Sequence, residues 1–332
     1  MTLRRSPLSD NATVNEELPR QPKRRGMRWI PGGTFRMGAE HSYPEEAPVH
    51  RVTVSGFWMD ERTVTNTEFT AFVAATGYRT VAERPLNPAD YPGAQPELLK
   101  PGSSVFFMPA RRVNLHDICS RWAYVPDANW CHPEGPASTI EGREHEPVVH
   151  VASEDAAAYA AWAGKELPTE AEWEFAARGG LDGALFCWGN EFNPGGHYMA
   201  NTWQGQFPFH DLALDGFAGR APVGSFSPNG HGLYDMAGNV WEWTNDWYSD
   251  CHPPEAKSPC CAPRDPRGSA EHRSYDPTQP EIRIPRKVIK GGSYLCAPNY
   301  CQRYRPAARY PQMIDTGTCH IGFRCVIRAE PD

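Results

Sequence analysis

The stretch LPTEAEWEFAARGG, Leu167–Gly180, predicts a short helix whose start and end are both defined by the sequence. Thr169 and Glu172 have the spacing of a capping box, in which each side chain accepts a hydrogen bond from a backbone N–H of the first turn. Gly179 stands where helices commonly end in a left-handed residue. The segment therefore predicts one well-bounded helix of about two to three turns.

Two further helices are expected upstream of this one. Thr65 and Glu68 have the spacing of another capping box, and Gly77 is the matching C-terminal residue. A third helix is expected over Ser153–Gly164. Residues at helical spacing are expected to face the core. They are Tyr159, Trp162, Trp173, Ala176 and Ala177.

The rest of the chain predicts short strands and turns. MRWIPGGTFRMG and HRVTVSGFWMDERTVT carry brief alternating apolar runs broken by glycine, and HIGFRCVI near the C-terminus alternates as an amphipathic strand would. Residues 82–146 lack periodicity and are expected to form an ordered loop. We expect a disordered tail over residues 1–26, a single α+β domain over residues 27–330 with little regular structure, and an exposed insertion over residues 246–286.

Composition excludes several classes of protein. The 332 residues carry a formal charge of −7, which argues against a nucleic-acid binder or a membrane-surface protein. No run of 18 apolar residues predicts a membrane span, and the N-terminus lacks the apolar core of a secretory signal. We therefore expect a cytoplasmic protein whose ten cysteines are mostly reduced.

Two cysteines stand out in KGGSYLCAPNYCQRYRPAAR, Lys290–Arg309. Cys296 and Cys301 are too far apart in sequence for a C-x-x-C redox pair, and they cannot complete a zinc site alone, whereas Cu(I) accepts two thiolates. A buried disulfide and two unrelated core cysteines are the alternatives. Three nearby arginines could lower the thiol pKa values or form ion pairs. They are Arg303, Arg305 and Arg309.

Other patterns are weaker or absent. Asn201, Asp215, Asp235 and Glu242 lie in turn-rich segments whose oxygens could bind Ca²⁺, although Asn and Asp are also ordinary turn residues. The twelve histidines form no H-E-x-x-H pattern, which argues against a zinc hydrolase. The chain has no G-x-S-x-G, no P-loop and no dinucleotide-binding glycine pattern, which argues against serine hydrolases and nucleotide enzymes.

Several blocks together resemble the formylglycine-generating enzyme family, also called sulfatase-modifying factors. They include IPGGTFRMG, HPEGPASTI, LPTEAEWE, ANTWQGQFP, GNVWEW, GGSYLCAPNYC and GFRC, and they cover nearly all of Met27–Arg328. LPTEAEWE and GNVWEW identify the fold, which the resemblance implies to be the irregular, C-type-lectin-like fold of that family. GGSY followed by the cysteine pair resembles the catalytic segment.

The resemblance implies an oxidase. Cys296 and Cys301 would hold Cu(I), and the substrate would be the cysteine of a Cys-x-Pro-x-Arg motif in an unfolded sulfatase. Its thiolate would join the copper, O₂ would bind, a hydrogen would leave the substrate Cβ, and the thioaldehyde would hydrolyse to formylglycine. The chain itself contains no Cys-x-Pro-x-Arg, so the substrate is expected to be another protein.

The resemblance also assigns further positions. Ser293 would contact the active-site pocket and Trp241 would form its wall. It favours structural calcium over the turn interpretation, in two sets. The first is Asn201, Asp215 and the carbonyls of Thr202 and Phe217; the second is Asp235, Glu242 and the carbonyls of Gly238 and Val240.

Some positions depart from the family pattern, and two other functions stay open. Ala297-Pro298-Asn299 replaces a more polar segment after Cys296, the surroundings of Asp315 differ, and Ala177 and Pro306 stand where secreted relatives carry cysteines. A same-fold oxidase with another substrate, such as one that matures siderophores, would keep the thiols. A non-catalytic, calcium-stabilised recognition module would not need them.

Overall fold

The structure is a computed structural model that describes residues 24–252 and 262–329, and regular elements in these ranges are short. The predicted tail therefore lies almost wholly outside the described residues. The helices are α1 (Asn66–Thr76), α2 (Ser153–Trp162) and α3 (Glu170–Arg178). The strands are β1 (Met27–Ile30), β2 (Gly33–Met37), β3 (His50–Val54), β4 (Phe57–Asp60), β5 (Gly102–Phe106), β6 (Trp122–Pro126), β7 (Gly205–Gln206), β8 (His210–Asp211), β9 (Trp241–Trp247), β10 (Arg286–Lys290), β11 (Tyr310–Met313), β12 (Ile321–Gly322) and β13 (Val326–Arg328).

Both predicted capping boxes are confirmed. The Thr65 hydroxyl accepts from the Glu68 N–H at 3.3 Å at the start of α1. The Thr169 hydroxyl accepts from the Glu172 N–H at 3.0 Å at the start of α3. Each of these helices ends at a glycine in the left-handed region, with φ of 65° and 58°. Local sequence alone therefore sets the bounds of these two helices.

One predicted core residue lies outside the core. Tyr159 is buried as expected, but Trp162 is 45% exposed. It stands at the last position of α2 and packs at the rim against Tyr159 and Phe72, with ring centroids 5.7 and 5.5 Å apart. The apolar stripe of α2 is thus wider than the face that the core covers.

The predicted amphipathic C-terminal strand is wrong. Residues 321–326 are all buried, and β12 pairs with β9 in parallel while β13 pairs with β4 in the antiparallel sense. Arg324 is fully buried because its guanidinium pairs with the Glu242 carboxylate at 2.7 Å. A charge at an alternating position indicates solvent exposure only when no partner lies inside.

Two segments differ from their predicted form. Residues 82–146, expected to be loop, contain the antiparallel ladder of β5 and β6. Residues 246–286, expected to be exposed, begin inside β9 and end at the first residue of β10, and Asp246 and Arg286 are buried. The stretch 263–283 is mostly exposed as predicted, and residues 253–261 lie outside the described chain.

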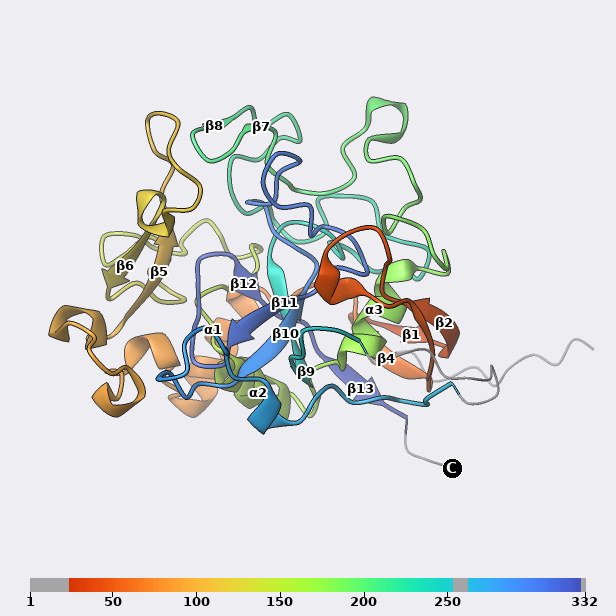
Figure 1. Ribbon diagram of the computed structural model, residues 1–332, viewed down its shortest axis with the longest axis horizontal. Helices are drawn as coiled ribbons and strands as arrows, with labels where there is room; N and C mark the ends of the chain where they lie inside the picture. The colour runs from red at the N-terminus through yellow and green to blue at the C-terminus, as the bar shows by residue number, and fades with distance from the viewer. Residues whose placement is uncertain (1–23, 253–261, 330–332) are drawn as a thin grey trace, which may run out of the picture.

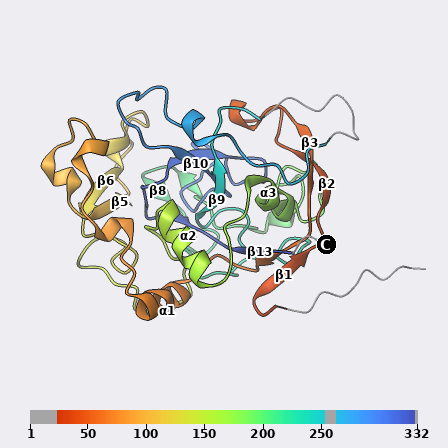
Figure 2. The ribbon, with the colours of Figure 1, turned by 90° about the horizontal axis from the view of Figure 1, so that it is seen from below.

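The strands form small sheets around α3. One sheet has the order β1-β4-β13 and another the order β11-β10-β9-β12, with β2-β3, β5-β6 and β7-β8 as separate ladders. Helix α3 packs against β2, β3, β9 and β10. The β5-β6 ladder lies at one end of the molecule and β1 and β2 at the other (Figures 1 and 2). The main core joins α1, α2, α3 and the strands around them, whereas Phe106 of β5 and Trp122 of β6 pack on a smaller cluster that includes Trp203 and Phe207. Together they fit the predicted single irregular α+β fold.

Candidate active site

The two cysteines lie on the loop between β10 and β11, which turns sharply at two glycines. Gly291 and Gly292 have φ of +93° and +71°. A Cβ on Gly292 would lie 2.9 Å from backbone atoms of Arg303, and a Cβ on Gly291 would lie 3.2 Å from the Trp173 ring. Only glycine meets both demands, so this pair fixes how the loop leaves β10.

Helix α3 anchors both ends of this loop through buried ion pairs. At the start, Lys290 Nζ lies 3.1 Å from a Glu174 carboxylate oxygen. At the end, the Arg309 guanidinium makes two hydrogen bonds, of 2.7 and 2.9 Å, to the Glu170 carboxylate. All four side chains are buried. The stretch that predicts α3 therefore also holds the cysteine loop in place.

The structure brings Cys296 and Cys301 together as free thiols. Their Sγ atoms are 3.1 Å apart, well beyond the roughly 2.05 Å of a disulfide bond. The turn between them is closed by the Cys301 N–H, which donates to the Ala297 carbonyl at 2.9 Å. Cys296 is buried, whereas Cys301 is only half-buried. Two neighbouring soft donors with one accessible side fit the donor set of a Cu(I) site.

The two thiols differ in acidity. Burial raises the pKa of Cys296 well above its usual value, and the hydrogen bond to Cys301 adds to this. The hydrogen bond from Cys296 and the charge of Arg303 lower the pKa of Cys301 to about 7. At pH 7 Cys301 is therefore about half ionised, and this negative charge lies on the more accessible sulfur.

Residues from far upstream position Arg303. Its guanidinium donates to a Glu45 carboxylate oxygen at 2.6 Å. It also stacks 3.7 Å from the ring centroid of Tyr43 and 4.9 Å from that of Tyr310. The sequence indicated a role for Arg303 on the thiols but not this clamp, because Tyr43 and Glu45 lie more than 250 residues away.

The thiols open into a cavity of about 370 Å³. Ser293 and Trp241 line it, as the resemblance implied, and Trp241 packs on Tyr310 with ring centroids 5.8 Å apart. Sequence reasoning missed most of the remaining wall, because those residues come from separate loops without a shared motif. They include Ile118, Trp122, Phe207, Tyr300 and His320.

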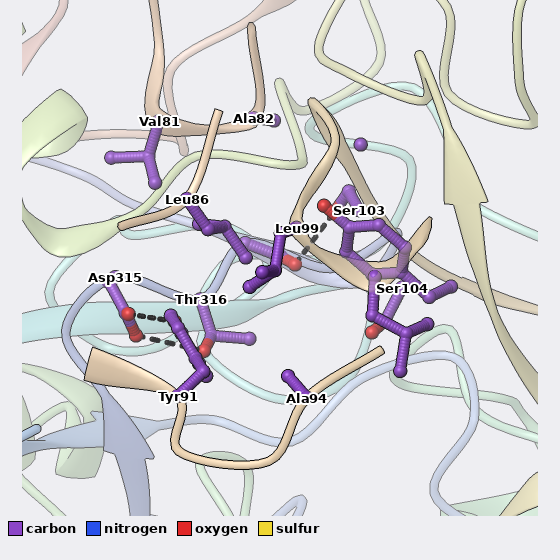
Figure 3. A pocket seen from close by; sticks show the side chains of 14 residues that line it. Val81, Ala82, Leu86, Tyr91, Ala94, Leu99, Ser103, Ser104, Asp315 and Thr316 are labelled. Carbon is purple, nitrogen blue, oxygen red and sulfur yellow. Dashed lines mark hydrogen bonds between the residues drawn. The ribbon is translucent and has the colours of Figure 1, made fainter. Parts of the chain in front are cut away.

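A second cavity of about 260 Å³ adjoins the first. Ser104 and Thr316 line both cavities, so they form a shared wall. Asp315 is the single carboxylate among the residues that line the second cavity, and the Tyr91 hydroxyl donates to it (Figure 3). Burial raises the pKa of Asp315. The remaining lining is largely apolar and includes Leu86 and Leu99.

The first predicted calcium set has the features of a cation site. The Asn201 Oδ1 atom is buried and has no hydrogen-bond partner. The Thr202 carbonyl and an Asp215 carboxylate oxygen both accept from the Gln204 side-chain amide, which places these two oxygens close together. Phe217 lies next to them, because its N–H donates to Asp215 at 3.0 Å. The orphaned Asn201 oxygen is the observation that favours a hard cation, and Thr202 and Asp215 would have to give up the Gln204 amide to bind one.

The second predicted calcium set does not fit an ion in this arrangement. Both Glu242 oxygens already accept hydrogen bonds from Arg324, and one also accepts from the Trp173 indole at 2.7 Å. Asp235 accepts from the Gly224 N–H, and burial raises the pKa of Asp235 to about 6. Gly238 and Val240 lie in the turn between these carboxylates. Within residues 24–252 and 262–329, no three His, Cys, Asp or Glu side chains are grouped to hold a metal.

Comparison with known proteins shows the family that this chain resembles. Residues 11–329 match the family model described as "Sulfatase-modifying factor enzyme 1-like domain". The chain is 53% identical over 300 residues to the formylglycine-generating enzyme of Mycobacterium tuberculosis, which covers 90% of this chain and 96% of that protein. It is also 38% identical over 311 residues, 91% of this chain and 86% of the other, to the inactive Cα-formylglycine-generating enzyme 2 of Mus musculus.

Among solved structures, PvdO from Pseudomonas aeruginosa has the same fold. It covers 90% of this chain and 93% of its own, with a TM-score of 0.59 and 24% identity. None of the helices in the described part of the chain is long and apolar enough to cross a membrane. Because similar chains include both an active enzyme and an inactive one, the site itself has to support a proposal of activity.

Proposed function

The chain belongs to the sulfatase-modifying factor family, and on that premise we propose that it converts the cysteine of a Cys-x-Pro-x-Arg motif in unfolded sulfatases to Cα-formylglycine. The proposal rests on one observation above all. Two free thiols lie 3.1 Å apart at the wall of a cavity large enough for a peptide side chain. Neither a recognition module nor a structural core needs such a pair facing a cavity.

The overall reaction needs an oxidant and a reductant. The substrate CH₂SH group and one water give CHO and H₂S, with release of two protons and two electrons. O₂ accepts these two electrons and two more from a thiol reductant, and together with the protons this gives water. Cu(I), when bound to Cys296 and Cys301, would supply a soft centre for the substrate thiolate and for O₂.

The chain's own residues would prepare this chemistry. The hydrogen bond from Cys296 and the charge of Arg303 lower the pKa of Cys301 to about 7, so a metal-binding thiolate is available at neutral pH. The Ser293 N–H contacts Cys296 Sγ at 3.4 Å and fixes the buried sulfur. Trp241 and the stacked rings of Phe207 and Tyr300, 4.2 Å apart, line the same cavity and limit access of water.

The second cavity would receive the arginine of the motif. It shares a wall with the thiol cavity, so one extended peptide can enter both. Among the described residues that line it, Asp315 carries the single carboxylate, and a guanidinium pairs strongly with a carboxylate in a partly desolvated site (Figure 3). The arginine would also bring the raised pKa of Asp315 down, which stabilises its charged form.

Calcium at the first predicted set would be structural. Asn201 and Asp215 lie on the segment that precedes β7 and on the one that follows β8, and an ion between them would tie this region together. We expect addition of a chelator to lower the Tm, and Ca²⁺ to restore it. A Tm unaffected by chelator would count against a bound ion.

The deciding experiment uses purified protein with Cu(I), O₂, a thiol reductant and a Cys-x-Pro-x-Arg peptide, followed by mass spectrometry. Conversion that is lost in Cys296→Ala but kept in Cys131→Ala, a free cysteine elsewhere, is the expected result. Tight Cu(I) binding without conversion would favour an oxidase with another substrate. Absence of copper binding together with dispensable thiols would favour the recognition module.

A further inference from the structure

A third cavity, of about 410 Å³, lies beside the active-site loop but is separate from the thiol cavity. Arg309 lines it, whereas the next residue, Tyr310, lines the thiol cavity. We propose that this third cavity binds a soft monovalent metal ion, Cu(I), through the side chains of Met37, His50 and His252. The proposal concerns a site distinct from the thiols and does not depend on the proposed reaction.

The three side chains are brought together by the fold. Met37 and His50 are directly opposite each other on the antiparallel strands β2 and β3, which places their Cβ atoms about 5 Å apart. The rings of His50 and His252 have centroids 4.8 Å apart at an angle of 46°. All three residues are buried, with exposed fractions of 4%, 4% and 6%, and all three line the cavity.

Both imidazoles have a nitrogen available for a metal. His50 Nδ1 lies 3.1 Å from the Pro48 carbonyl, so this nitrogen carries the proton and Nε2 keeps its lone pair. Metal-binding histidines commonly use such a backbone carbonyl to fix their tautomer. His252 Nε2 is buried and has no hydrogen-bond partner. An orphaned buried polar atom is costly unless a ligand satisfies it.

The charges in the cavity favour a soft ion over a hard one. The Glu170 carboxylate is held by Arg309 at 2.7 Å, and the Asp246 carboxylate lies 3.4 Å from Arg267. No unpaired carboxylate is therefore left among the described residues that line the cavity. Thioether sulfur and neutral imidazole nitrogen select Cu(I), whereas Ca²⁺ and Mg²⁺ require oxygen ligands.

Cys251 also lines the cavity, and its exposed thiol offers a further soft donor at the open side. The test therefore has to separate binding by the buried trio from binding by this thiol.

The test removes the active-site thiols first. The Cys296→Ala/Cys301→Ala protein is titrated with Cu(I) without oxygen against a chromophoric Cu(I) chelator. We expect one bound equivalent. His252→Phe and the volume-conserving Met37→Leu should each weaken its binding more than about tenfold. Matched controls, Met236→Leu in the core and His210→Phe on the surface, should leave it unchanged. X-ray absorption should report nitrogen and sulfur neighbours.

Several outcomes would overturn the proposal. They are no bound equivalent in the double-alanine protein, an affinity that neither Met37→Leu nor His252→Phe alters, and Zn²⁺ bound more tightly than Cu(I). Loss of binding in Cys251→Ser alone would place the ion on the exposed thiol instead. If His252→Phe fails to fold by circular dichroism, Met37→Leu decides, because Leu fills nearly the same volume.

Discussion

Charged side chains are buried and paired on one side of the loop between β10 and β11, whereas on the other side a charged sulfur lines a cavity. Toward α3, Lys290 and Arg309 are fully paired with Glu174 and Glu170 in a buried network. Toward the cavity, the charge of Cys301 faces Arg303 and open space. The ion pairs with α3 occupy the charges of Lys290 and Arg309 and fix the loop backbone. The difference indicates that α3 holds the loop rigid while the Cys301 sulfur remains accessible from the cavity.

The largest effect is expected at Cys301, the more accessible of the two sulfurs. Cys301→Ser should reduce turnover of a Cys-x-Pro-x-Arg peptide by more than about a thousandfold, because serine cannot act as a soft thiolate ligand. The Tm should change little, since Cys301 is only half-buried and makes no ion pair to α3. Peptide conversion and thermal unfolding measured on the same sample check this. Full activity in the variant would refute the proposed function.

Removing a buried carboxylate that anchors the loop should lower the free energy of unfolding. Glu174→Gln keeps the shape but leaves Arg178 buried without its counter-charge and leaves Lys290 only the Glu170 carboxylate, at 3.7 Å. We expect a loss of about 3–5 kcal/mol in the free energy of unfolding. Glu166→Gln, which removes an exposed partner of Arg328, should cost no more than about 1 kcal/mol. Denaturant unfolding compares the two, and equal effects would mean that the buried network is not what holds the loop.

Acid should weaken the same network. Burial by itself would raise the pKa of Glu174, but Lys290 and Arg178 outweigh it and lower the pKa from 4.5 to about 2. A carboxylate with a lowered folded-state pKa stabilises the fold above its unfolded pKa, and this stability is lost as the pH falls from about 4.5 to 2. The loss amounts to about 3 kcal/mol. Glu174→Gln should flatten this part of the pH–stability curve; an unchanged curve would assign the acid sensitivity to other groups.

The second cavity offers a smaller effect on substrate binding. Asp315→Asn should lower kcat/KM for a Cys-x-Pro-x-Arg peptide about tenfold to a hundredfold, mainly through KM, because a charge-assisted pair is lost. A peptide with alanine in place of arginine should lose about the same factor with the unaltered protein and little more with the variant. Additive losses would show that Asp315 and the arginine do not meet.

The smallest expected effect concerns thiol acidity. In metal-free protein, alkylation of Cys301 by iodoacetamide should rise with pH around a midpoint near 7, so that the rate at pH 6 is about tenfold below its plateau. Arg303→Met should move the midpoint upward. Peptide mapping identifies the alkylated residue. Preferential labelling of Cys296 would reverse the assigned order of acidity.

Local chemistry made much of this fold predictable. The bounds of α1 and α3 follow from their capping boxes and terminal glycines, which act within a few residues. The burial of Arg324 and the exposure of Trp162 were not predictable, because each depends on what another segment places nearby. The β5-β6 ladder also escaped prediction, since its residues show no clean alternation.

The candidate site likewise combines residues that nearby sequence predicts with residues that distant segments supply. Cys296 and Cys301 are five residues apart, so the sequence shows the pair directly, and the resemblance adds Ser293 and Trp241. Tyr43 and Glu45, which clamp Arg303, come from a distant segment and carry no motif of their own. The unpartnered Asn201 oxygen of the first calcium set and the pairing of Glu242 with Arg324 in the second are visible only in the structure, because each depends on distant residues.

The wall shared by the two cavities has a consequence for the substrate. Ser104 and Thr316 separate the place where a sulfur would sit from the place where a guanidinium would sit. Because the distance between these two positions is fixed, the site would select peptides by the number of residues between the cysteine and the arginine. The identity of the residues in between would matter less. The spacing of the motif would then matter as much as its residues. A peptide with one residue more or fewer between the cysteine and the arginine would bind poorly, even though it carried every required side chain.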